Sequence, residues 1–479
     1  MSTTSYFLYK KQVSYDGSNW YDVQPSVYSY DGDGTQTPVV KEAHDAFCGA
    51  LPPIYRWVDT QDTICVEAQT KFSATYSDST TYIIPCTSSS TLTSQEIKAH
   101  TTPYSSMTSA VIGSCVTRLG ENAFEDCTNL SSVTIPSSLQ RVDLNGFNTS
   151  GISDVYLEDL SSWCNVSMYA FWVSNPFYRA DASNISQKLY INGVSVSSLT
   201  IPNDVTTINY GVFARCNAIK RLTIPSNVRT IGNSSFRGCP NLSSLTLNEG
   251  VEVISEDAFF ETPLTSITIP NSVTAIYGGA FTHCEKVERI EIGSGLTTIT
   301  YQANGNPFDV SPLNQSNKFR VLSSITVSPD NTHFEAVNNC LVETSTKKLV
   351  VGCKNSVIPN DIVEIGRDAF SHVSGLTSIQ LPSTLANIGI NAFIYCRDLT
   401  SVTIPSSVTE IHSDAFGFCD RINSVTILAT TPPTLDGVSA FRPTSSLNNY
   451  PIYVPAQSVE AYKTANVWSE ISSRIQAIP

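Results

Sequence analysis

The chain has 479 residues and a net charge of −14, with 28 lysines and arginines against 42 aspartates and glutamates. Because phosphate binding needs a clustered positive field, this acidic balance argues against nucleic acid as a partner. The sequence shows no export signal and no run near the roughly 18 apolar residues of a membrane span, so we expect a soluble chain. Only 15% of residues are charged, and serine and threonine hydroxyls are expected to supply much of the surface polarity.

Residues 1–105 are predicted to form a small all-β module, whose role the sequence does not indicate. Asp16-Gly17 separates Gln12–Tyr15 from Trp20–Val23, and this dipeptide supplies the positive φ angles that a tight hairpin turn requires. We therefore expect a β-hairpin there. Further strand-like runs lie at residues 54–58, 64–66 and 81–84.

Residues 106–430 contain a tract of the form Val-Thr-Ile-Pro that returns at a fixed interval. The spacing is 23 residues both from Ile201 to Ile224 and from Ile404 to Ile427. A period in this range predicts a solenoid of stacked units, here about a dozen rungs of 22–23 residues. Function in such a protein is expected on an extended surface rather than in an internal active site.

Within a rung, the Val-Thr-Ile tract is predicted to be a short strand. In the unit Leu399–Cys419, Val402 and Ile404 should point into the core and Thr403 outward, because side chains alternate along a strand. The proline that follows ends the pairing, since it has no N–H to donate. An Ala-Phe pair further along each rung is expected to form the opposite wall of the core.

Phenylalanine and cysteine recur in register along this opposite wall. The phenylalanines expected to form a ladder are Phe124, Phe213, Phe236, Phe259, Phe281, Phe370, Phe393, Phe416 and Phe441. Cysteine follows three residues later at Cys127, Cys216, Cys239, Cys284, Cys396 and Cys419. Thr262 and Val373 occupy the same position in other rungs, so we predict a small packing position, with disulfides between adjacent rungs as the alternative.

Two stretches interrupt the period. The interval is 44 residues between Leu157 and Ile201, and 35 residues between Ile292 and Val327. Insertions in a solenoid map to loops on one face, which is often the binding face. After the array, residues 431–479 are predicted to form a C-terminal cap with a helical segment at Ser458–Gln476.

The unit Leu399–Cys419 resembles the leucine-rich repeat of the BspA-like surface proteins of bacteria from mouth and gut. Their pattern is close to Leu-Thr-Ser-Val-Thr-Ile-Pro-x-Ser-Val-Thr-x-Ile-Gly-x-x-Ala-Phe-x-x-Cys, and the resemblance covers residues 107–479. Further matches are Ile224–Cys239, Ile269–Cys284, Leu381–Cys396, Val155–Cys164, Leu189–Gly193, Asn339–Glu343, Leu349–Cys353 and Ile452–Tyr462. The resemblance implies a curved, β-rich leucine-rich-repeat solenoid at the cell surface or outside the cell. It also implies adhesion to host matrix proteins or other cells, and no shared catalytic residue.

Cysteines outside the ladder offer two candidate disulfides. Cys48 and Cys65, with Cys86, provide one possible bridge in the N-terminal module if the protein is secreted. Cys340 and Cys353 flank an expected hairpin and form the second candidate pair. The chain has 13 cysteines, an odd number, so they cannot all pair within one molecule.

The sequence predicts no catalytic residue, cofactor site or metal site. Asp31-Gly-Asp33-Gly34 places alternating carboxylates before a glycine turn, as a calcium loop does, but Val40 stands where the bidentate glutamate would be, so we expect a polar turn. The histidines are scattered, and each is expected to be a solvated loop residue: His44, His100, His283, His333, His372 and His412.

The favoured hypothesis is a non-enzymatic, adhesin-like binding protein, expected to be a monomer, that contacts a protein or glycan on host or neighbouring cells. Candidate contacts are the outward strand positions Thr223, Thr246, Thr268, Glu291, Thr326, Gln380, Thr403 and Thr426, with Trp163, Phe171, Trp172 and Phe177 of the first insertion. Two alternatives stay open for these residues: strand propensity alone explains the threonines, and the aromatic side chains form a local core. The alternative function is a rigid spacer carrying a binding or anchoring N-terminal module. An enzymatic module is disfavoured, since no paired carboxylates are evident.

Overall fold

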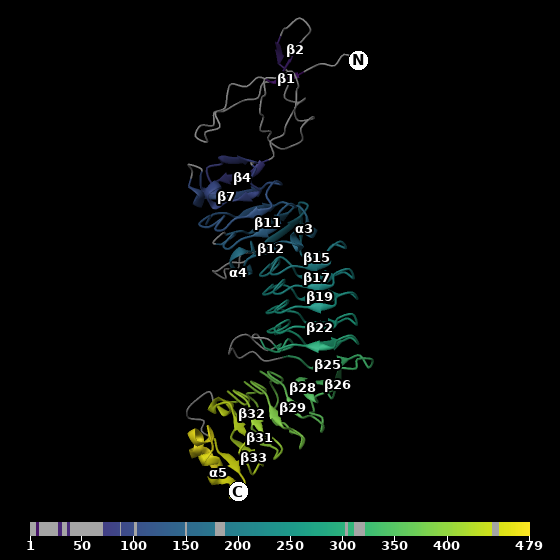
Figure 1. The fold of residues 1–479 in the computed structure, drawn as a ribbon, viewed down its shortest axis with the longest axis vertical. Coiled ribbons are helices and arrows are strands. Elements are labelled where there is room, and N and C mark those ends of the chain that lie inside the picture. Colours follow the sequence, from purple (N-terminus) through teal and green to yellow (C-terminus); the bar gives the residue numbers. More distant parts are fainter. Residues whose placement is uncertain are drawn as a thin grey trace.

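The computed structural model describes residues 70–86, 88–99, 103–148, 151–177, 187–301, 305–310, 321–442 and 450–479. Nearer the N-terminus it also describes the backbone of three strands, β1 (Tyr6–Leu8), β2 (Val27–Tyr30) and β3 (Gln36–Pro38), which pair antiparallel. The expected hairpin around Asp16-Gly17 and the strand-like runs at 54–58 and 64–66 lie outside the described residues. The rungs stack along the long axis of the molecule and bend into an arc (Figure 1). The predicted solenoid is confirmed.

Most regular rungs contribute a long strand to what we call the first wall. These strands form four sheets. The first contains β4 (Thr70–Tyr76), β5 (Thr81–Pro85), β7 (Met107–Ile112), β9 (Ser132–Ile135), β11 (Asp154–Leu157), β13 (Lys188–Ile191) and β14 (Val194–Val196). The second and third contain β15 (Ser198–Thr200), β17 (Arg221–Ile224) and β19 (Ser244–Leu247), then β21 (Ser266–Ile269), β23 (Arg289–Ile292) and β25 (Ser324–Val327). The fourth contains β31 (Ser401–Ile404), β33 (Ser424–Ile427), β35 (Ile452–Val454) and β36 (Ile475–Ala477).

Most rungs add a short strand to a second wall, which the sequence analysis did not predict. Its first sheet contains β6 (Thr91–Leu92), β8 (Arg118–Leu119), β10 (Arg141–Val142) and β12 (Ser167–Met168). Its second contains β16 (Thr207–Ile208), β18 (Thr230–Ile231), β20 (Val253–Ile254), β22 (Ala275–Ile276) and β24 (Thr298–Ile299). Its third contains β26 (Phe334–Val337), β27 (Cys340–Glu343), β28 (Lys348–Val351), β29 (Glu364–Ile365), β30 (Asn387–Ile388), β32 (Glu410–Ile411) and β34 (Thr434–Leu435).

The predicted Val-Thr-Ile strand is confirmed in detail. Strand β31 pairs in parallel with β33, so that Val402 lies opposite Val425 and Ile404 opposite Ile427. All four of these side chains are buried, while the threonine between them faces outward. Because identical positions are paired in neighbouring rungs, each apolar side chain covers its counterpart and the stack buries a continuous core.

A third ladder of hydrogen bonds runs through the segments around the recurring phenylalanines, which we call the phenylalanine wall. In one rung the N–H groups of Ser234, Phe236 and Gly238 all donate to carbonyl oxygens of the following rung. In most rungs the residues two before and two after the phenylalanine have positive φ, so the chain bends on both sides of the ring. The position two before accordingly holds residues that tolerate this conformation: Asn122, Asn145, Gly211, Ser234, Asp257, Gly279, Asp368, Asn391 and Asp414.

The phenylalanine rings stack as predicted. Ring centroids are 5.2 Å apart for Phe213 and Phe236, and 5.5 Å apart for Phe236 and Phe259, with interplanar angles of 5°. Two further members, missed by the sequence analysis, come from the insertions: Phe177 stacks on Phe213, and Phe308 stacks on Phe281. The insertions therefore continue the wall rather than interrupt it.

The β27–β28 hairpin separates two hydrophobic cores. The side chains of Leu341 and Val350 pack in the N-terminal core, which begins at Phe72. Those of Val342 and Leu349 pack in the C-terminal core, which extends to Ile475. Since side chains alternate across a strand, a hairpin that is apolar on both faces serves both cores at once.

A buried carboxyl group lies beside this junction on the phenylalanine wall. Asp368 is buried, and the Nε atom of Arg367 lies 3.3 Å from its Oδ2 atom. Burial raises the pKa of Asp368 to about 6, and the nearby carboxyl of Asp309 adds to this effect. Asn306, in the insertion between these rungs, donates to the carbonyl of Val350 at 2.7 Å and connects the two sides of the junction.

Elements other than regular rungs lie at both ends of the described solenoid. Strands β4 and β7 pair antiparallel, and β6 pairs with β8, so the sheets continue across the predicted boundary at residue 105. At the other end, the expected helix at Ser458–Gln476 is shorter: α5 spans Val459–Thr464, a 3-10 segment, η4, spans Trp468–Arg474, and β36 follows. The indole of Trp468 donates to the carbonyl of Pro433 at 2.7 Å and packs against the last ladder ring, Phe441.

The remaining helices of the described residues are short. They are α2 (Ser94–Lys98), α3 (Leu160–Cys164) and α4 (Phe171–Ser174), with the 3-10 segments η1 (Tyr104–Ser106), η2 (Val438–Phe441) and η3 (Ala456–Ser458). None of the helices in the described ranges has the length and apolar character that crossing a membrane requires.

Replacing Phe236 by alanine is expected to lower the free energy of unfolding by about 3–5 kcal/mol, because the ring is fully buried between two stacked neighbours. Denaturant unfolding followed by circular dichroism measures the change. The control is Thr246→Ala at an exposed strand position. Equal stability of the two variants would show that the ladder does not hold the rungs together.

Replacing Asp368 by asparagine is expected to flatten the pH dependence of stability. An aspartate in an unfolded chain titrates near pH 4, so the raised pKa means that the folded protein binds the proton more tightly. This stabilisation is complete below about pH 4 and is lost as the pH rises through about 6. Melting temperatures of the wild type should therefore fall relative to Asp368→Asn between these pH values. Parallel curves for the two proteins would contradict the assignment.

Candidate functional site

The predicted outward residues form rows on the first wall. Thr223 lies opposite Thr246, Glu291 lies between Thr268 and Thr326, and Gln380, Thr403 and Thr426 follow one another in the C-terminal half. Thr246, Thr268, Thr326, Gln380 and Thr403 are exposed, and Thr223, Glu291 and Thr426 are half-buried. We call these side chains the outward rows. They present mostly hydroxyl groups to solvent.

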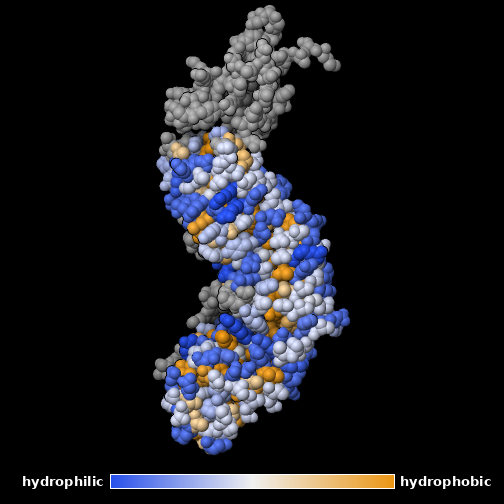
Figure 2. Space-filling model, in the orientation of Figure 1, coloured by the Kyte–Doolittle hydropathy of each residue, from blue (hydrophilic) through white to orange (hydrophobic). Residues whose placement is uncertain are grey.

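The outward rows carry little charge. Glu291 accepts a hydrogen bond from the Thr268 hydroxyl at 3.3 Å and pairs with Arg289 at 3.2 Å. Its negative charge is therefore compensated within the same sheet. On the face drawn in Figure 2, blue and white areas predominate and orange is confined to separate small areas. The outward rows themselves offer hydroxyl groups that can hydrogen-bond on successive rungs.

Two tyrosines extend the same surface toward the N-terminus, and the sequence analysis missed them. Tyr156 and Tyr190 lie opposite each other in paired strands, with stacked rings 4.3 Å apart. The Tyr190 hydroxyl donates to Asp154 at 3.2 Å. In the sequence, these tyrosines stand at the middle position of Val-Tyr-Leu and Leu-Tyr-Ile. This position corresponds to the outward threonine of a regular rung.

Of the four aromatic residues named in the first insertion, one is exposed. Trp163 is 2% exposed, Phe171 8% and Phe177 2%, whereas Trp172 is 50% exposed. The Trp163 indole donates to the carbonyl of Val212 at 3.0 Å inside the core. Trp163, Phe171 and Phe177 are thus core residues in this fold, as the alternative interpretation held, and Trp172 alone is available to a ligand.

Both insertions contribute a ring to the phenylalanine wall through the tract Asn-Pro-Phe. The Asn175 side chain donates to the carbonyl of Gly211 and accepts from the N–H of Phe177 at 2.8 Å. Asn306 accepts from the N–H of Phe308 at 3.0 Å in the same way. The buried asparagine ties the ring to the adjacent rung. The parts of the insertions that the structure describes are therefore anchored segments.

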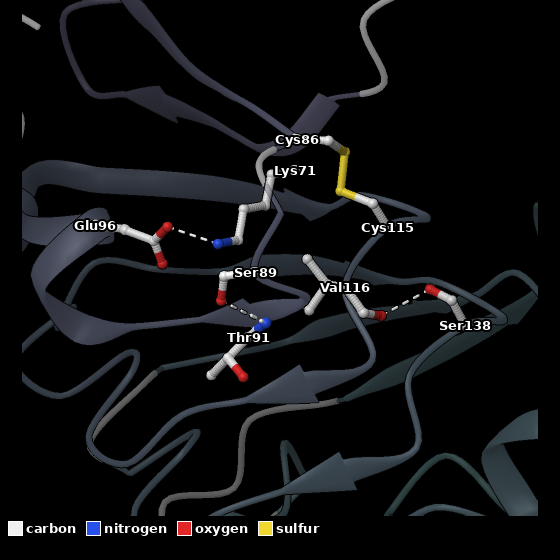
Figure 3. Close-up of a disulfide and its surroundings, with 8 residues drawn as sticks. All are labelled: Lys71, Cys86, Ser89, Thr91, Glu96, Cys115, Val116 and Ser138. Atoms are coloured by element: carbon white, nitrogen blue, oxygen red, sulfur yellow. Dashed lines mark hydrogen bonds and ion pairs between the residues drawn. A yellow bond between two sulfur atoms is a disulfide. The ribbon is translucent and has the colours of Figure 1, made fainter. Parts of the chain in front are cut away.

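The disulfide in the described part of the chain joins Cys86 to Cys115, a pairing that the sequence analysis did not consider (Figure 3). The two α-carbons are 6.3 Å apart, within the range that a bridge spans. It ties the β5 end to the rung that follows β7. Beside it the buried ammonium of Lys71 lies 2.6 Å from Glu96. Cys48 and Cys65 lie outside the described residues.

The cysteines of the ladder are packing residues. All six are buried thiols. The thiol of Cys239 donates to the carbonyl of Phe213 at 3.1 Å, and Cys396 and Cys419 make equivalent bonds to the preceding rungs. Burial raises the pKa of the Cys216 thiol to about 12, which keeps it neutral. Cys340 and Cys353, the second candidate pair, are also free and buried on either side of the confirmed hairpin.

The described histidines do not gather at one place. His283 and His372 both occupy the positive-φ position two after a ladder phenylalanine. His412 contacts Asp436 at 2.6 Å, and the His333 ring bonds to Thr332 at 3.0 Å. Within the described residues, no three histidine, cysteine or acidic side chains lie together as metal ligands would. His44, His100 and the Asp31-Gly-Asp33-Gly34 turn lie outside the described residues.

The geometry defines the class as a leucine-rich-repeat solenoid, and comparison with known proteins gives the family. The BspA type leucine-rich repeat region, in six copies, matches residues 95–220, 183–308 and 350–465. These segments cover well over half of the chain. The protein therefore belongs to the BspA-type leucine-rich-repeat family, which confirms the resemblance seen in the sequence.

Several solved bacterial structures are similar to this chain. A leucine-rich cell surface protein from Faecalibacterium prausnitzii has 21% identity and a TM-score of 0.47, with 88% of this chain and 100% of that chain covered. A leucine-rich-repeat protein from Bacteroides ovatus has 16% identity, a TM-score of 0.42 and the same coverage. One from Eubacterium ventriosum has 22% identity and a TM-score of 0.46, with 55% and 68% covered. No curated protein matches the chain.

The ladder thiols are expected to resist alkylation in the folded protein, because the thiolate is the reactive form and burial disfavours it. The test uses a chain with Cys48→Ser and Cys65→Ser, iodoacetamide and mass spectrometry. Native protein should stay unlabelled at the nine buried cysteines of the described residues that lie outside the disulfide, and denatured protein should label at all of them. Rapid native labelling of Cys239 or Cys419 would refute the packing role.

Proposed function

We propose that this protein is a non-enzymatic binding protein, at the cell surface or outside the cell, that presents its extended leucine-rich-repeat surface to a macromolecule. The partner is a protein or glycan on host or neighbouring cells, such as a matrix protein. The observation that carries the proposal is the in-register arrangement of the outward rows. One partner can contact equivalent side chains on successive rungs, so weak contacts add along the stack.

Two further observations support the location. The Cys86–Cys115 disulfide is of a kind that persists in oxidising environments such as the cell exterior. The chain also belongs to the BspA-type leucine-rich-repeat family, and one similar solved structure is described as a cell surface protein. A surface rich in hydroxyls and low in net local charge suits contact with large polar partners.

The first experiment screens the whole chain against immobilised matrix proteins and glycans to obtain a ligand. The second replaces Thr223, Thr268 and Thr403 together by alanine. Affinity for that ligand, measured by surface plasmon resonance, is expected to fall by about tenfold or more, because the three residues sample the whole length of the outward rows.

The matched control replaces three exposed threonines beside the second wall instead of the first. Thr206, Thr274 and Thr409 are exposed threonines that directly precede short strands of the second wall. Their replacement by alanine should leave binding unchanged. If the outward triple variant binds as tightly as the wild type, the outward rows are not the binding surface.

A further inference from the structure

A pocket of about 330 Å³ lies on the phenylalanine wall, away from the outward rows. This volume is at the lower end of the range of about 300–1,000 Å³ that is usual for small-molecule sites. Three residues line it from equivalent positions in consecutive rungs, each three residues before a ladder phenylalanine: Tyr210, Asn233 and Glu256. Helix α4 of the first insertion supplies the remaining side, with Phe171 and Trp172.

The aromatic side chains of the pocket are held in place by packing against one buried ring. Phe171 is buried and meets the rings of both Trp172 and Tyr210 edge to face, at centroid distances of 5.2 and 5.7 Å. Trp172 stays half exposed above this support. An exposed indole at the rim of a pocket keeps apolar surface in contact with water, which is unfavourable. A ligand that packs against the ring would remove this surface from water.

The polar side of the pocket is fixed as well. The Arg237 guanidinium is paired with the buried carboxyl of Asp257 and lies 3.7 Å above the ring of Phe260. Its charge is therefore compensated and its position constrained on two sides. Asn233 is exposed and Glu256 half-buried at the same opening, and these side chains provide both hydrogen-bond donors and acceptors.

We propose that this pocket binds a neutral sugar residue, a pyranose that packs its C–H face on Trp172 and directs its hydroxyl groups to Asn233, Glu256 and Arg237. The combination of one aromatic platform with fixed donors and acceptors matches a ligand that has an apolar face and a polar rim. Two carboxylates against one guanidinium disfavour an anion. Of the three rings at the pocket, Phe171 is buried and supports the other two instead of facing the ligand.

This site lies on a wall that the outward rows do not include. It rests on the proposed function only in assuming that the chain is a binding protein. Isothermal titration calorimetry with methyl β-glucoside, methyl β-galactoside, N-acetylglucosamine, cellobiose and lactose tests it directly on the full chain. At least one of these sugars should bind saturably, and Trp172→Ala should weaken its binding by about tenfold or more.

The matched control is Tyr169→Ala, which removes another exposed aromatic ring close in sequence but outside the pocket. It should leave sugar affinity and melting temperature unchanged, as should the outward triple threonine variant. Trp172→Phe, which keeps an aromatic platform, should retain most of the affinity. Melting temperatures of all variants show whether each one folds.

Three results would overturn the proposal. They are the absence of saturable binding by every sugar, sugar binding that persists in Trp172→Ala, and binding of choline or glucuronate in preference to the neutral sugars. Failure of this site is distinguishable from failure of the proposed function. A chain that binds a matrix protein through the outward rows but binds no sugar would reject the pocket alone.

Discussion

The solenoid depends on one geometric requirement. Each turn of the chain must bring every position back to a place directly above the equivalent position of the turn before it. Three ladders of hydrogen bonds meet this requirement in a rung: a long strand, a short strand and the phenylalanine wall. The third is the most demanding, because the backbone adopts positive φ on both sides of most of the rings. When the backbone adopts this conformation, each buried ring, thiol or aliphatic side chain packs against the side chain at the equivalent position of the neighbouring rung.

Periodicity in the sequence predicted those parts of the fold that repeat with the same residue types. The strand Val402–Ile404, the ladder of phenylalanines and the cysteine position three residues later were all recognisable because each one recurs. The short strands were missed because two residues, such as Glu410–Ile411, are too few to show an alternating pattern. The positive-φ position was visible as recurring Asn, Asp or Gly, a signal that the sequence analysis did not use.

Where the period of 23 residues fails, the sequence no longer shows which side chains point into the core and which point to solvent. Phe177 and Phe308 belong to the ladder, but only their shared Asn-Pro-Phe tract reveals this. The same loss of register placed Trp163 and Phe171 among candidate contacts, although both are buried. Cys115 escaped notice as a disulfide partner because it lies in a degenerate first rung. The pocket beside Trp172 required three rungs and a helix to be in place together, which no local pattern encodes.

The hairpin between the two cores also bears on how such a chain can change over generations. Each core packs against its own face of β27–β28. Adding or deleting a rung in one half therefore alters the height of that half without repacking the other. If the number of rungs in such a chain changes, this hairpin is therefore the place where a change in one half does not require a matching change in the core of the other. The length of the solenoid before the hairpin and the structure of its C-terminal end can in this way be inherited separately.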